Sequence, residues 1–474
     1  MTAPVIVWFR DDLRLADNPA LHAAAASGRP VVPVFVWDDD PPDGRTPGAA
    51  ARWWLHGSLA ALDAGLGGRL VRRRGRADAV IPDLAATLGA TVVHWNRAIV
   101  PCDVDRDEAL VRRLAALGVT AAVGAPDTLH PPGQVRTRSG GAFRVFTPFW
   151  AVCRAQGAPA RPLPSPARLS FAPDAVAGLR LDDLNLRPST PDWASGLHAA
   201  WTPGEAAAQA DLAGFVEGAL ADYAVVRDRP DQRGTSRLSP RLRFGELSPR
   251  QVWHATATAG DGAGVEVHLR QLGWREFAYH LLGQAPDMAR VPLKASFAAF
   301  PWRADAAAFR AWRRGRTGYP LVDAGLRELW STGWMHNRAR MVAASFLIKH
   351  LLLPWQDGEA WFWDTLVDAD PANNPVGWQW VAGSGADAAP FFRVFNPARQ
   401  AETHDPDGTY TRRWVPELAR LPVALLHRPW TAGPLELAAA GVRLGVDYPF
   451  PLVDHAAARA RALDAYARLG RACG

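Results

Sequence analysis

Short runs of β-branched residues alternate with alanine-rich stretches over residues 1–128, and this alternation limits the possible folds more than any other feature. The apolar runs lie at residues 5–9, 31–37, 91–95 and 119–123, with a weaker one near Leu70. Helical stretches such as residues 51–63 and 105–117 separate them. Strands that alternate with helices form a parallel sheet covered by helices. The sequence therefore predicts an α/β domain over residues 1–128.

The first predicted strand is not followed by the glycine fingerprint of dinucleotide-binding domains. In that fingerprint, G-x-G-x-x-G, the glycines let the backbone approach a pyrophosphate closely. Arg10, Asp11 and Asp12 stand at this place instead. We therefore expect a Rossmann-like parallel sheet that is not the nucleotide-binding half of a standard dehydrogenase.

Two further segments follow residue 128, and they differ from the first and from each other in composition and pattern. Residues 129–200 are rich in Pro, Arg and Ser, which predicts a long connector. Helical patterns then continue over residues 201–474 without a β-branched run of strand length, so this part is expected to be an all-α domain. Thr202-Pro203-Gly204-Glu205 and Ser248-Pro249-Arg250-Gln251 both predict helix starts with a capping box and an early proline.

Composition excludes several classes of protein. With 474 residues the chain is longer than one core usually serves, and 48% hydrophobic with 21% charged residues excludes a disordered chain. No apolar run approaches the length of a membrane span, and the start of the chain lacks a secretory signal. The net charge of +6, carried almost entirely by arginine, favours an anionic partner.

Cysteine usage indicates the compartment. Cys102, Cys153 and Cys473 form neither a disulfide framework nor a metal-ligand spacing. A reducing, cytoplasmic location is therefore expected, and no metal site is predicted.

Two stretches in the helical half could bind ligands. Tyr223 and residues 235–239 (TSRLS) supply hydroxyls and a guanidinium before helical sequence, a possible phosphate seat. Taken alone, an ordinary polar loop explains them better. Gln271, Trp274 and Ala278 share one helical face that could bind a flat ligand, although a core helix with one buried tryptophan is the simpler explanation.

A third stretch, residues 330–397, is denser in polar and aromatic residues. Asn337 and Met341 share a helical face at a spacing of one turn. Asp368, Asp370 and Asn374 are expected to cluster in a loop just before two tryptophans. Such loops are usually functional surfaces, although Asp and Asn also make ordinary turns.

Long motifs in a fixed order resemble the photolyase/cryptochrome flavoprotein family over essentially the whole chain. They are WFRDDLRLADNPAL, TSRLSPRLRFGELSPR, WREF, TGYPLVDAGLRELWSTGWMHNRARM and NNPVGWQWVAGSGADAAPFFRVFNP. The resemblance implies that the all-α domain holds a U-shaped FAD. It also implies an enzyme in which light drives an electron from reduced FAD into damaged DNA and back, without NAD or a metal.

The resemblance also assigns residues to the flavin. The implied FAD contacts are Tyr223, Thr235, Ser236, Arg237, Leu238, Ser239, His268, Arg275, Arg340, Asp368, Ala369 and Asp370. Asn374 matches the side chain that faces flavin N5, where it can favour the reduced state. Trp378, Trp355 and Trp302 match a three-indole chain that carries electrons between flavin and surface. Most of the other 18 of the 21 tryptophans are expected in cores.

DNA is the implied partner, with a pyrimidine dimer flipped out of the duplex into a pocket above the FAD adenine. The implied contacts to the dimer or to DNA are Arg227, Gln271, Trp274, Asn337, Arg338, Met341, Trp380, Arg393 and Gln400, and Arg275 could also reach the pocket rim. Several phosphate contacts predict an affinity that falls with salt.

The type of lesion follows from two positions. Relatives that repair the six-four photoproduct carry two histidines where this chain has Asn337 and Met341, whereas relatives that repair cyclobutane dimers carry Asn and Met. The chain therefore resembles a cyclobutane pyrimidine dimer photolyase. Gln271 and His268 depart from the usual Glu and Trp, which leaves a cryptochrome-type light sensor, or a photolyase for another lesion, as alternatives. The chain ends at Gly474 without a long tail, which favours the enzyme.

A second, light-harvesting chromophore is also implied, and its identity stays open. Methenyltetrahydrofolate and 8-hydroxy-5-deazaflavin are the choices, with a slight preference for the folate. Cys102-Asp103 lies about where folate-binding relatives have a polar and an acidic residue. Arg52-Trp53-Trp54 is equally consistent with a packed helix. A monomer without an obligate protein partner is expected.

Overall fold

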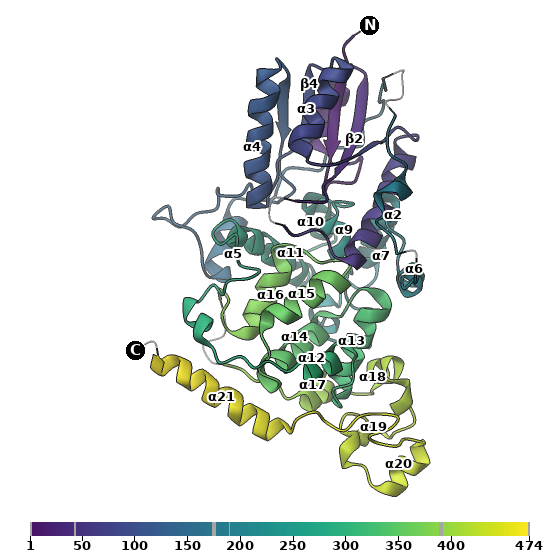
Figure 1. Ribbon diagram of the computed structural model, residues 1–474, viewed down its shortest axis with the longest axis vertical. Helices are drawn as coiled ribbons and strands as arrows, with labels where there is room; N and C mark the ends of the chain where they lie inside the picture. Colours follow the sequence, from purple (N-terminus) through teal and green to yellow (C-terminus); the bar gives the residue numbers. More distant parts are fainter. Residues whose placement is uncertain (1, 42–43, 173–176, 189, 388–391, 473–474) are drawn as a thin grey trace. The chain divides into compact units, whose positions relative to one another are not determined.

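The computed structural model describes residues 2–41, 44–172, 177–188, 190–387 and 392–472, and the chain divides into two compact units (Figure 1). Unit 1 comprises Met1–Ala221, Ser236–Pro286 and Val367–Asp370. Unit 2 comprises Asp222–Thr235, Asp287–Leu366 and Pro371–Gly474. Each unit therefore combines segments that are far apart in the sequence. Cys473 lies outside the described residues, as does the stretch 388–391 of the last family motif.

Unit 1 contains a five-stranded, wholly parallel sheet in the order β3-β2-β1-β4-β5. The strands are β1 (Val5–Phe9), β2 (Val31–Trp37), β3 (Val71–Arg74), β4 (Val92–Asn96) and β5 (Thr120–Gly124). Val5 pairs with Val31 on one side and with Val92 on the other, so the direction of strand addition reverses at β1. The α/β fold and the four stronger strands are confirmed, each within one residue, and the weaker candidate is β3.

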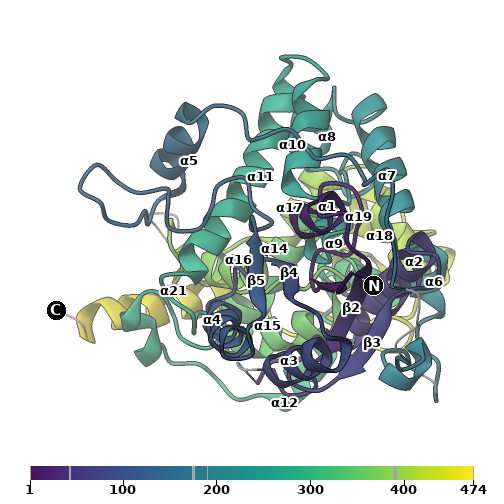
Figure 2. The ribbon, with the colours of Figure 1, turned by 90° about the horizontal axis from the view of Figure 1, so that it is seen from above.

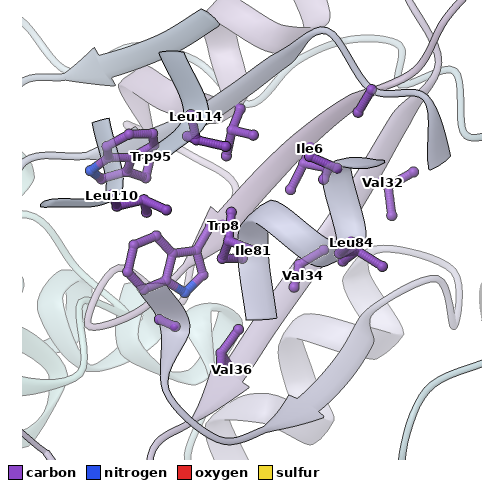
Figure 3. Close-up of a cluster of buried hydrophobic side chains, with 14 of the residues drawn as sticks. Ile6, Trp8, Val32, Val34, Val36, Ile81, Leu84, Trp95, Leu110 and Leu114 are labelled. Carbon is purple, nitrogen blue, oxygen red and sulfur yellow. The ribbon is translucent and has the colours of Figure 1, made fainter. Parts of the chain in front are cut away.

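Helices cover both faces of this sheet. Figure 2 shows α3 (Ala77–Leu88) and α4 (Pro101–Ala116) on one side of the strands and α1 (Pro19–Ala26) on the other. The core between the strands and α3 and α4 is shown in Figure 3 and contains Ile6, Trp8, Val34, Ile81, Leu84, Trp95 and Leu110, all nearly inaccessible to solvent. Burying each of these side chains stabilises the sheet by roughly 1.5–3 kcal/mol.

The remaining helices of unit 1 are α2 (Ala49–Gly65), α5 (Phe146–Ala155), η1 (Leu181–Leu184), α6 (Ser195–Ala200), α7 (Glu205–Glu217), α9 (Ser239–Arg243), α10 (Pro249–Ala257) and α11 (Ala263–Leu282). Helices α5, η1 and α6 all lie in the segment expected to be a connector, and the longest of them, α5, was not predicted. Its helical periodicity is short and is flanked by Pro- and Gly-rich sequence, which concealed it.

One of the two predicted capping boxes is confirmed and the other is wrong. Ser248 Oγ accepts from Gln251 N at 3.0 Å, and Gln251 Oε1 accepts from Ser248 N at 2.8 Å. Helix α7 instead begins at Glu205 after Gly204, which makes no side-chain cap. The Glu205 carboxylate is used elsewhere: it accepts from the backbone N–H groups of Leu15 (2.7 Å) and Ala16 (2.9 Å).

The described residues of unit 2 form helices joined by loops, with one isolated β-bridge between Leu444 and Tyr448 and no strand, which confirms the predicted all-α character of this part of the chain. Its helices are α8 (Tyr223–Val226), η2 (Ala295–Ala299), α12 (Ala306–Arg313), α13 (Pro320–Thr332), α14 (Asn337–Ser345), η3 (Phe346–His350), α15 (Trp355–Thr365), α16 (Asn373–Ala382), α17 (Pro397–His404), α18 (Thr409–Trp414), η4 (Pro416–Leu418), α19 (Val423–Leu426), η5 (Pro429–Thr431), α20 (Pro434–Ala440) and α21 (His455–Ala472). Helix α14 continues into η3, one turn of π-helix, and π-turns of this kind are frequent at functional sites. Within the described residues, no helix combines the length and apolarity needed to cross a membrane.

Candidate functional site

A polar network in unit 1 holds the segment Val367–Asp370, which carries three of the predicted flavin contacts. Ser239 Oγ donates to Asp368 Oδ2 at 2.6 Å, and Arg243 Nε donates to the carbonyl of Ala369 at 2.9 Å. Tyr279 OH donates to Asp370 Oδ2 at 2.6 Å. Helices α9 and α11 therefore fix the backbone and both carboxylates of a segment that lies far from them in the sequence.

Charge strengthens this network. The guanidinium of Arg243 forms an ion pair with Asp11 at 2.9 Å. Burial by itself lowers the pKa of Arg243, but Asp11, Tyr279 and Asp370 raise it above its ordinary value. Burial, followed by the charge of Asp370, raises the pKa of Tyr279 well above its usual range. Tyr279 therefore stays protonated and donates a hydrogen bond to Asp370. Asp368 likewise accepts a hydrogen bond from Ser239, so both carboxylates of the segment act as acceptors.

The predicted phosphate seat lies at the start of α9. Ser236, Arg237 and Leu238 directly precede the helix, and Arg237 adopts a left-handed backbone conformation with φ of 52°. Its guanidinium lies 4.1 Å from the ring centre of Trp201. Because the Ser239 hydroxyl hydrogen is directed at Asp368, this hydroxyl does not donate to a phosphate in the same arrangement. Thr235 and the buried Tyr223 belong to unit 2.

Helix α11 carries four of the predicted residues. Trp274 stacks on Phe146 with ring centres 3.7 Å apart and planes within 8° of parallel. Gln271 Nε2 donates to the carbonyl of Val267 one turn earlier, at 3.2 Å. His268 is buried, shares a hydrogen bond of 3.0 Å with Thr256 Oγ1 and packs on a phenylalanine of α7. The surroundings of His268 are therefore those of a packed core histidine.

Arg275, the fourth of these residues, joins α11 to the loop after β5. Its Nη1 donates to the carbonyl of Asp127 at 3.2 Å and lies 3.4 Å from Glu276 Oε1. Glu276 Oε2 in turn accepts from the N–H groups of Leu129 (3.0 Å) and His130 (3.3 Å). Burial raises the pKa of Glu276 to about 7. The structure therefore engages Arg275 inside unit 1 rather than leaving it as a free cation.

In unit 2, Asn374 lies in the first turn of α16 and not in a loop as expected, because helix α16 begins at Asn373. Its Nδ2 donates to Glu359 Oε1 at 2.8 Å and to the Glu359 carbonyl at 3.1 Å. Glu359 lies on α15 and is only 3% exposed. Both amide hydrogens are therefore directed at α15, and the amide oxygen is the atom left to accept from a ligand.

Trp378 lies one turn further along α16 and is packed on α15. Its ring centre is 4.9 Å from that of Phe362 and 6.2 Å from that of Trp312. A Cβ at Gly358 would come within 2.1 Å of the Trp378 ring, so only glycine allows this packing. Trp355, the first residue of α15, is buried, and the half-buried Trp302 lies 4.3 Å from Phe300. The three predicted relay tryptophans thus all lie in unit 2.

The start of α14 brings together the two residues that indicate the lesion. Asn337 Nδ2 lies 3.8 Å from Met341 Sδ, and Arg338 pairs with Asp228 at 2.7 Å. His336 caps the helix by accepting from Arg338 N at 3.1 Å, and burial lowers the pKa of His336 to about 4. The helix therefore begins beside a neutral histidine, with Asn337 exposed.

The remaining predicted flavin and DNA contacts of unit 2 lie on different helices and loops. Arg340 Nε donates to the carbonyl of Met335 at 2.7 Å, and the Arg227 guanidinium lies 5.5 Å from the Tyr223 ring centre. Trp380 is half-buried on α16 and Arg393 is exposed. Gln400, on α17, has a buried Oε1 with no hydrogen-bond partner among the described residues.

Lys349 and Glu359 are two of the buried ionisable residues that sequence reasoning missed. Lys349, in the π-turn, donates to the carbonyl of Arg393 at 2.5 Å, and burial lowers its pKa to about 7. A lone lysine inside the apolar run SFLIKHLLL was the available signal. Glu359 gave no such signal, because its partner Asn374 lies on the next helix.

The residues considered for the second chromophore are engaged in unit 1. Trp53 and Trp54 are buried on α2, and Trp54 Nε1 donates to Glu246 at 3.0 Å. Asp103 pairs with Arg106 at 2.8 Å on α4. The packed-helix interpretation therefore accounts for both tryptophans.

Comparison with known proteins gives consistent results. Residues 5–167 match the family model described as DNA photolyase, and residues 268–468 match the FAD binding domain of DNA photolyase. A deoxyribodipyrimidine photo-lyase from Agrobacterium fabrum is 48% identical over 98% of both chains. Cryptochrome-1 of Arabidopsis thaliana is 39% identical over 98% of this chain and 70% of its own length. A solved bacterial class III photolyase from Agrobacterium tumefaciens superposes with a TM-score of 0.96 at 48% identity, covering 99% of this chain and 98% of that one.

Proposed function

The chain belongs to the DNA photolyase family, and on that premise we propose that it is a deoxyribodipyrimidine photo-lyase, which splits cyclobutane pyrimidine dimers in DNA with light and FAD. The observation that carries this proposal is the match to a photo-lyase over 98% of both chains at 48% identity. A match of this extent spans the regions of both family models in this chain, so it supports the complete reaction and not only flavin binding.

The side chains present fit FAD. The network of Ser239, Arg243 and Tyr279 presents the carboxylates of Asp368 and Asp370 as acceptors, which suits the hydroxyl and N–H groups of a flavin and its ribityl chain. Reduced FAD supplies an electron donor that absorbs light. The proposed flavin contacts further include Tyr223, Thr235, Ser236, Arg237, Leu238, His268, Arg275, Arg340 and Ala369.

Two side chains of unit 2 have proposed roles in setting the redox state of the flavin. Glu359 holds both hydrogens of the Asn374 amide, so Asn374 Oδ1 can accept from a flavin N–H that exists only in the reduced form. Trp378 is proposed as the first donor of a relay that continues to Trp355 and Trp302. Indole is readily oxidised, and Trp378 is buried and therefore protected from solvent.

The proposed lesion is the cyclobutane dimer. Asn337 and Met341 lie in contact at the exposed start of α14, where relatives that repair the six-four photoproduct carry two histidines. Ring splitting by electron transfer needs no strong acid, whereas six-four repair does. The proposed contacts to the dimer and to DNA are Trp274, Gln271, Trp380, Arg227, Arg338, Arg393 and Gln400.

A light sensor of the cryptochrome type is the second candidate, because a plant cryptochrome is 39% identical over 98% of this chain. Gln271 bears on this choice, since its amide can hydrogen-bond a pyrimidine but cannot supply a charge. We further propose a monomer that acts in the cytoplasm. A second chromophore, methenyltetrahydrofolate or 8-hydroxy-5-deazaflavin, is also part of the proposal.

The decisive experiment measures loss of dimers from ultraviolet-irradiated oligothymidylate. Purified, chemically reduced protein is illuminated with blue light, and an identical sample is kept dark. Recovery of thymine absorbance in the light alone is the expected result. Bound and photoreducible FAD without recovery would favour the cryptochrome, and the six-four substrate would then separate a sensor from a photolyase for another lesion.

A further inference from the structure

Two stacked tryptophans lie on the surface of unit 2 without an assigned role. Trp330 on α13 stacks on Trp361 of α15, with ring centres 5.9 Å apart and planes 4° from parallel. Trp330 is 62% exposed, although large aromatic side chains normally gain stability by burial. An exposed indole whose orientation is fixed by a second ring behind it provides a rigid, flat surface for another ring.

Four arginines lie on and just after α12, and one of them, Arg313, contacts this stack. The guanidinium of Arg313 lies 4.9 Å from the ring centre of Trp361 and 5.1 Å from that of Phe309. Arg310 lies one turn before Arg313, and Arg314 and Arg316 follow it. Arg310, Arg314 and Arg316 are exposed.

These four cations differ from the other arginines nearby in their acidic partners. In the part of the chain that the structure describes, no carboxylate forms an ion pair with Arg310, Arg313, Arg314 or Arg316. By contrast, Arg327 on the neighbouring α13 pairs with Glu417 at 2.8 Å. Arg310 lies three and four residues before Arg313 and Arg314, so these like charges repel one another, although the C-terminal end of α12 that carries them favours cations. An anionic ligand would remove that repulsion.

The backbone holds this patch in place. Trp312, fully buried, anchors α12 by donating from Nε1 to the carbonyl of Ala343 at 3.0 Å. Gly315 turns the chain with φ of 58°, and a Cβ there would lie 2.7 Å from the Asp323 carbonyl on α13. The arginines on both sides of this turn are therefore presented from a fixed backbone next to α13.

We propose that Trp330, Trp361 and the four arginines form a binding site for single-stranded nucleic acid. Proteins that bind single strands combine cations along the backbone with aromatic rings on which bases stack. Bases inside an intact duplex are already stacked and do not offer a free face to Trp330, so the indole selects the single strand. None of these six residues belongs to the contacts proposed for the lesion or the flavin, and the site is independent of the proposed repair reaction.

The test titrates an undamaged oligothymidylate of eight nucleotides in the dark over a series of salt concentrations. Trp330→Leu keeps an apolar side chain and removes the ring. It should weaken binding by about 5-fold to 150-fold, the range measured for one stacked base. Trp330→Phe keeps a ring and should recover most of the affinity. Arg310→Gln combined with Arg314→Gln should reduce the slope of log K against log salt by about 1.4, at about 0.7 for each phosphate contact.

The control variant also removes two positive charges, but at another place on unit 2. Arg420→Gln with Arg468→Gln removes two exposed arginines of unit 2 and should leave the slope unchanged. An equal slope change in this control, or wild-type affinity in Trp330→Leu, would overturn the proposal. Equal binding of thymidine monophosphate and the oligonucleotide would also overturn it, in favour of a small-molecule site. Dimer repair, measured on the same proteins, tests the photolyase proposal separately.

Discussion

Replacing Glu246 by Gln should destabilise unit 1 strongly, because four hydrogen-bond donors converge on this buried carboxylate. Oε1 accepts from Ser58 Oγ (2.5 Å), Gly204 N (2.6 Å) and Trp54 Nε1 (3.0 Å), and Oε2 accepts from Arg241 Nη1 (2.7 Å). Glu246 and Arg241 are 0% and 2% exposed. In the variant one amide oxygen can serve only part of this set, and the amide hydrogens face the guanidinium.

The size of the effect follows from the burial of the charge pair. Removing one partner of a buried ion pair costs about 3–5 kcal/mol, because the other charge stays behind. Arg241 keeps Asp211 at 2.8 Å and the Thr202 carbonyl at 2.9 Å, so the lower end, about 3 kcal/mol, is expected. For a unit of this size the melting temperature should fall by about 6–12 °C, at about 2–4 °C for each kcal/mol.

Loss of the Glu246 interactions should also affect the segment Val367–Asp370, which carries three of the predicted flavin contacts. Arg241 lies on α9, and the same helix holds Asp368 through Ser239. Glu246→Gln should therefore also retain less FAD on purification.

The assay is thermal and urea unfolding followed by tryptophan fluorescence, with Glu266→Gln as the control. Glu266 pairs with Arg154 at 3.3 Å on the surface, and its loss should change the free energy of unfolding by less than about 0.5 kcal/mol. A loss of less than 1 kcal/mol in Glu246→Gln would refute the reasoning. The double variant Glu246→Leu, Arg241→Met should cost less than the sum of the two single variants, since no charge is left unpaired.

Three further predictions concern the flavin and pH. Asn374→Leu removes the acceptor held by Glu359 and should shorten the lifetime of the reduced flavin in air; a lifetime equal to that of the wild type would contradict the assigned role. Trp378→Phe should block photoreduction yet leave repair by chemically reduced protein intact, and loss of repair there would show a wider role for this ring. Burial raises the pKa of Glu276 from 4.5 to about 7, so the folded state binds the proton more tightly and stability is lost as pH rises through that range. Glu276→Gln should therefore unfold less readily than the wild type at pH 8 but not at pH 5, and a difference that is constant with pH would show that Glu276 does not titrate there.

The strands could be predicted because their signal is local. The two central runs, Val5–Phe9 and Val31–Trp37, are buried along their whole length, so hydrophobicity within each run fixes its position. Helix starts depend more on neighbours. Ser248 caps its own helix, but the Glu205 carboxylate binds two N–H groups of the segment after β1, and no pattern around residue 205 reveals that competitor.

The candidate site shows the same limit. The polar stretch and the family resemblance located Asp368, Asp370 and Asn374, yet the groups that orient them are Tyr279, Ser239 and Glu359. Each orienting residue belongs to another helix, and the polar bond that matters forms only when the helices pack. A single sequence therefore identifies the residues that could touch a ligand more readily than those that hold them.

The sequence lacks the glycine fingerprint after β1, and in the structure polar side chains occupy the place where such a fingerprint would bind a nucleotide. Ligands of open parallel sheets usually bind at the carboxyl ends of the strands where the strand order reverses, here between β1 and β4. At this place Arg10 binds Asp107 at 2.8 Å, and Asn96 Nδ2 donates to Asp12 at 2.6 Å.

The N-terminus of α1, the helix that follows β1, is occupied by the protein's own side chains in the same way. Asn96 Oδ1 accepts from Ala20 N at 2.9 Å, and Asn18 caps the helix by accepting from Leu21 N at 3.1 Å. The N–H groups that would receive a pyrophosphate in a dinucleotide-binding domain are thus bound by the protein's own amides. A nucleotide would have to displace these bonds together with the partly buried ion pair of Arg10 and Asp107, and for that reason a second chromophore in unit 1 should bind away from this place.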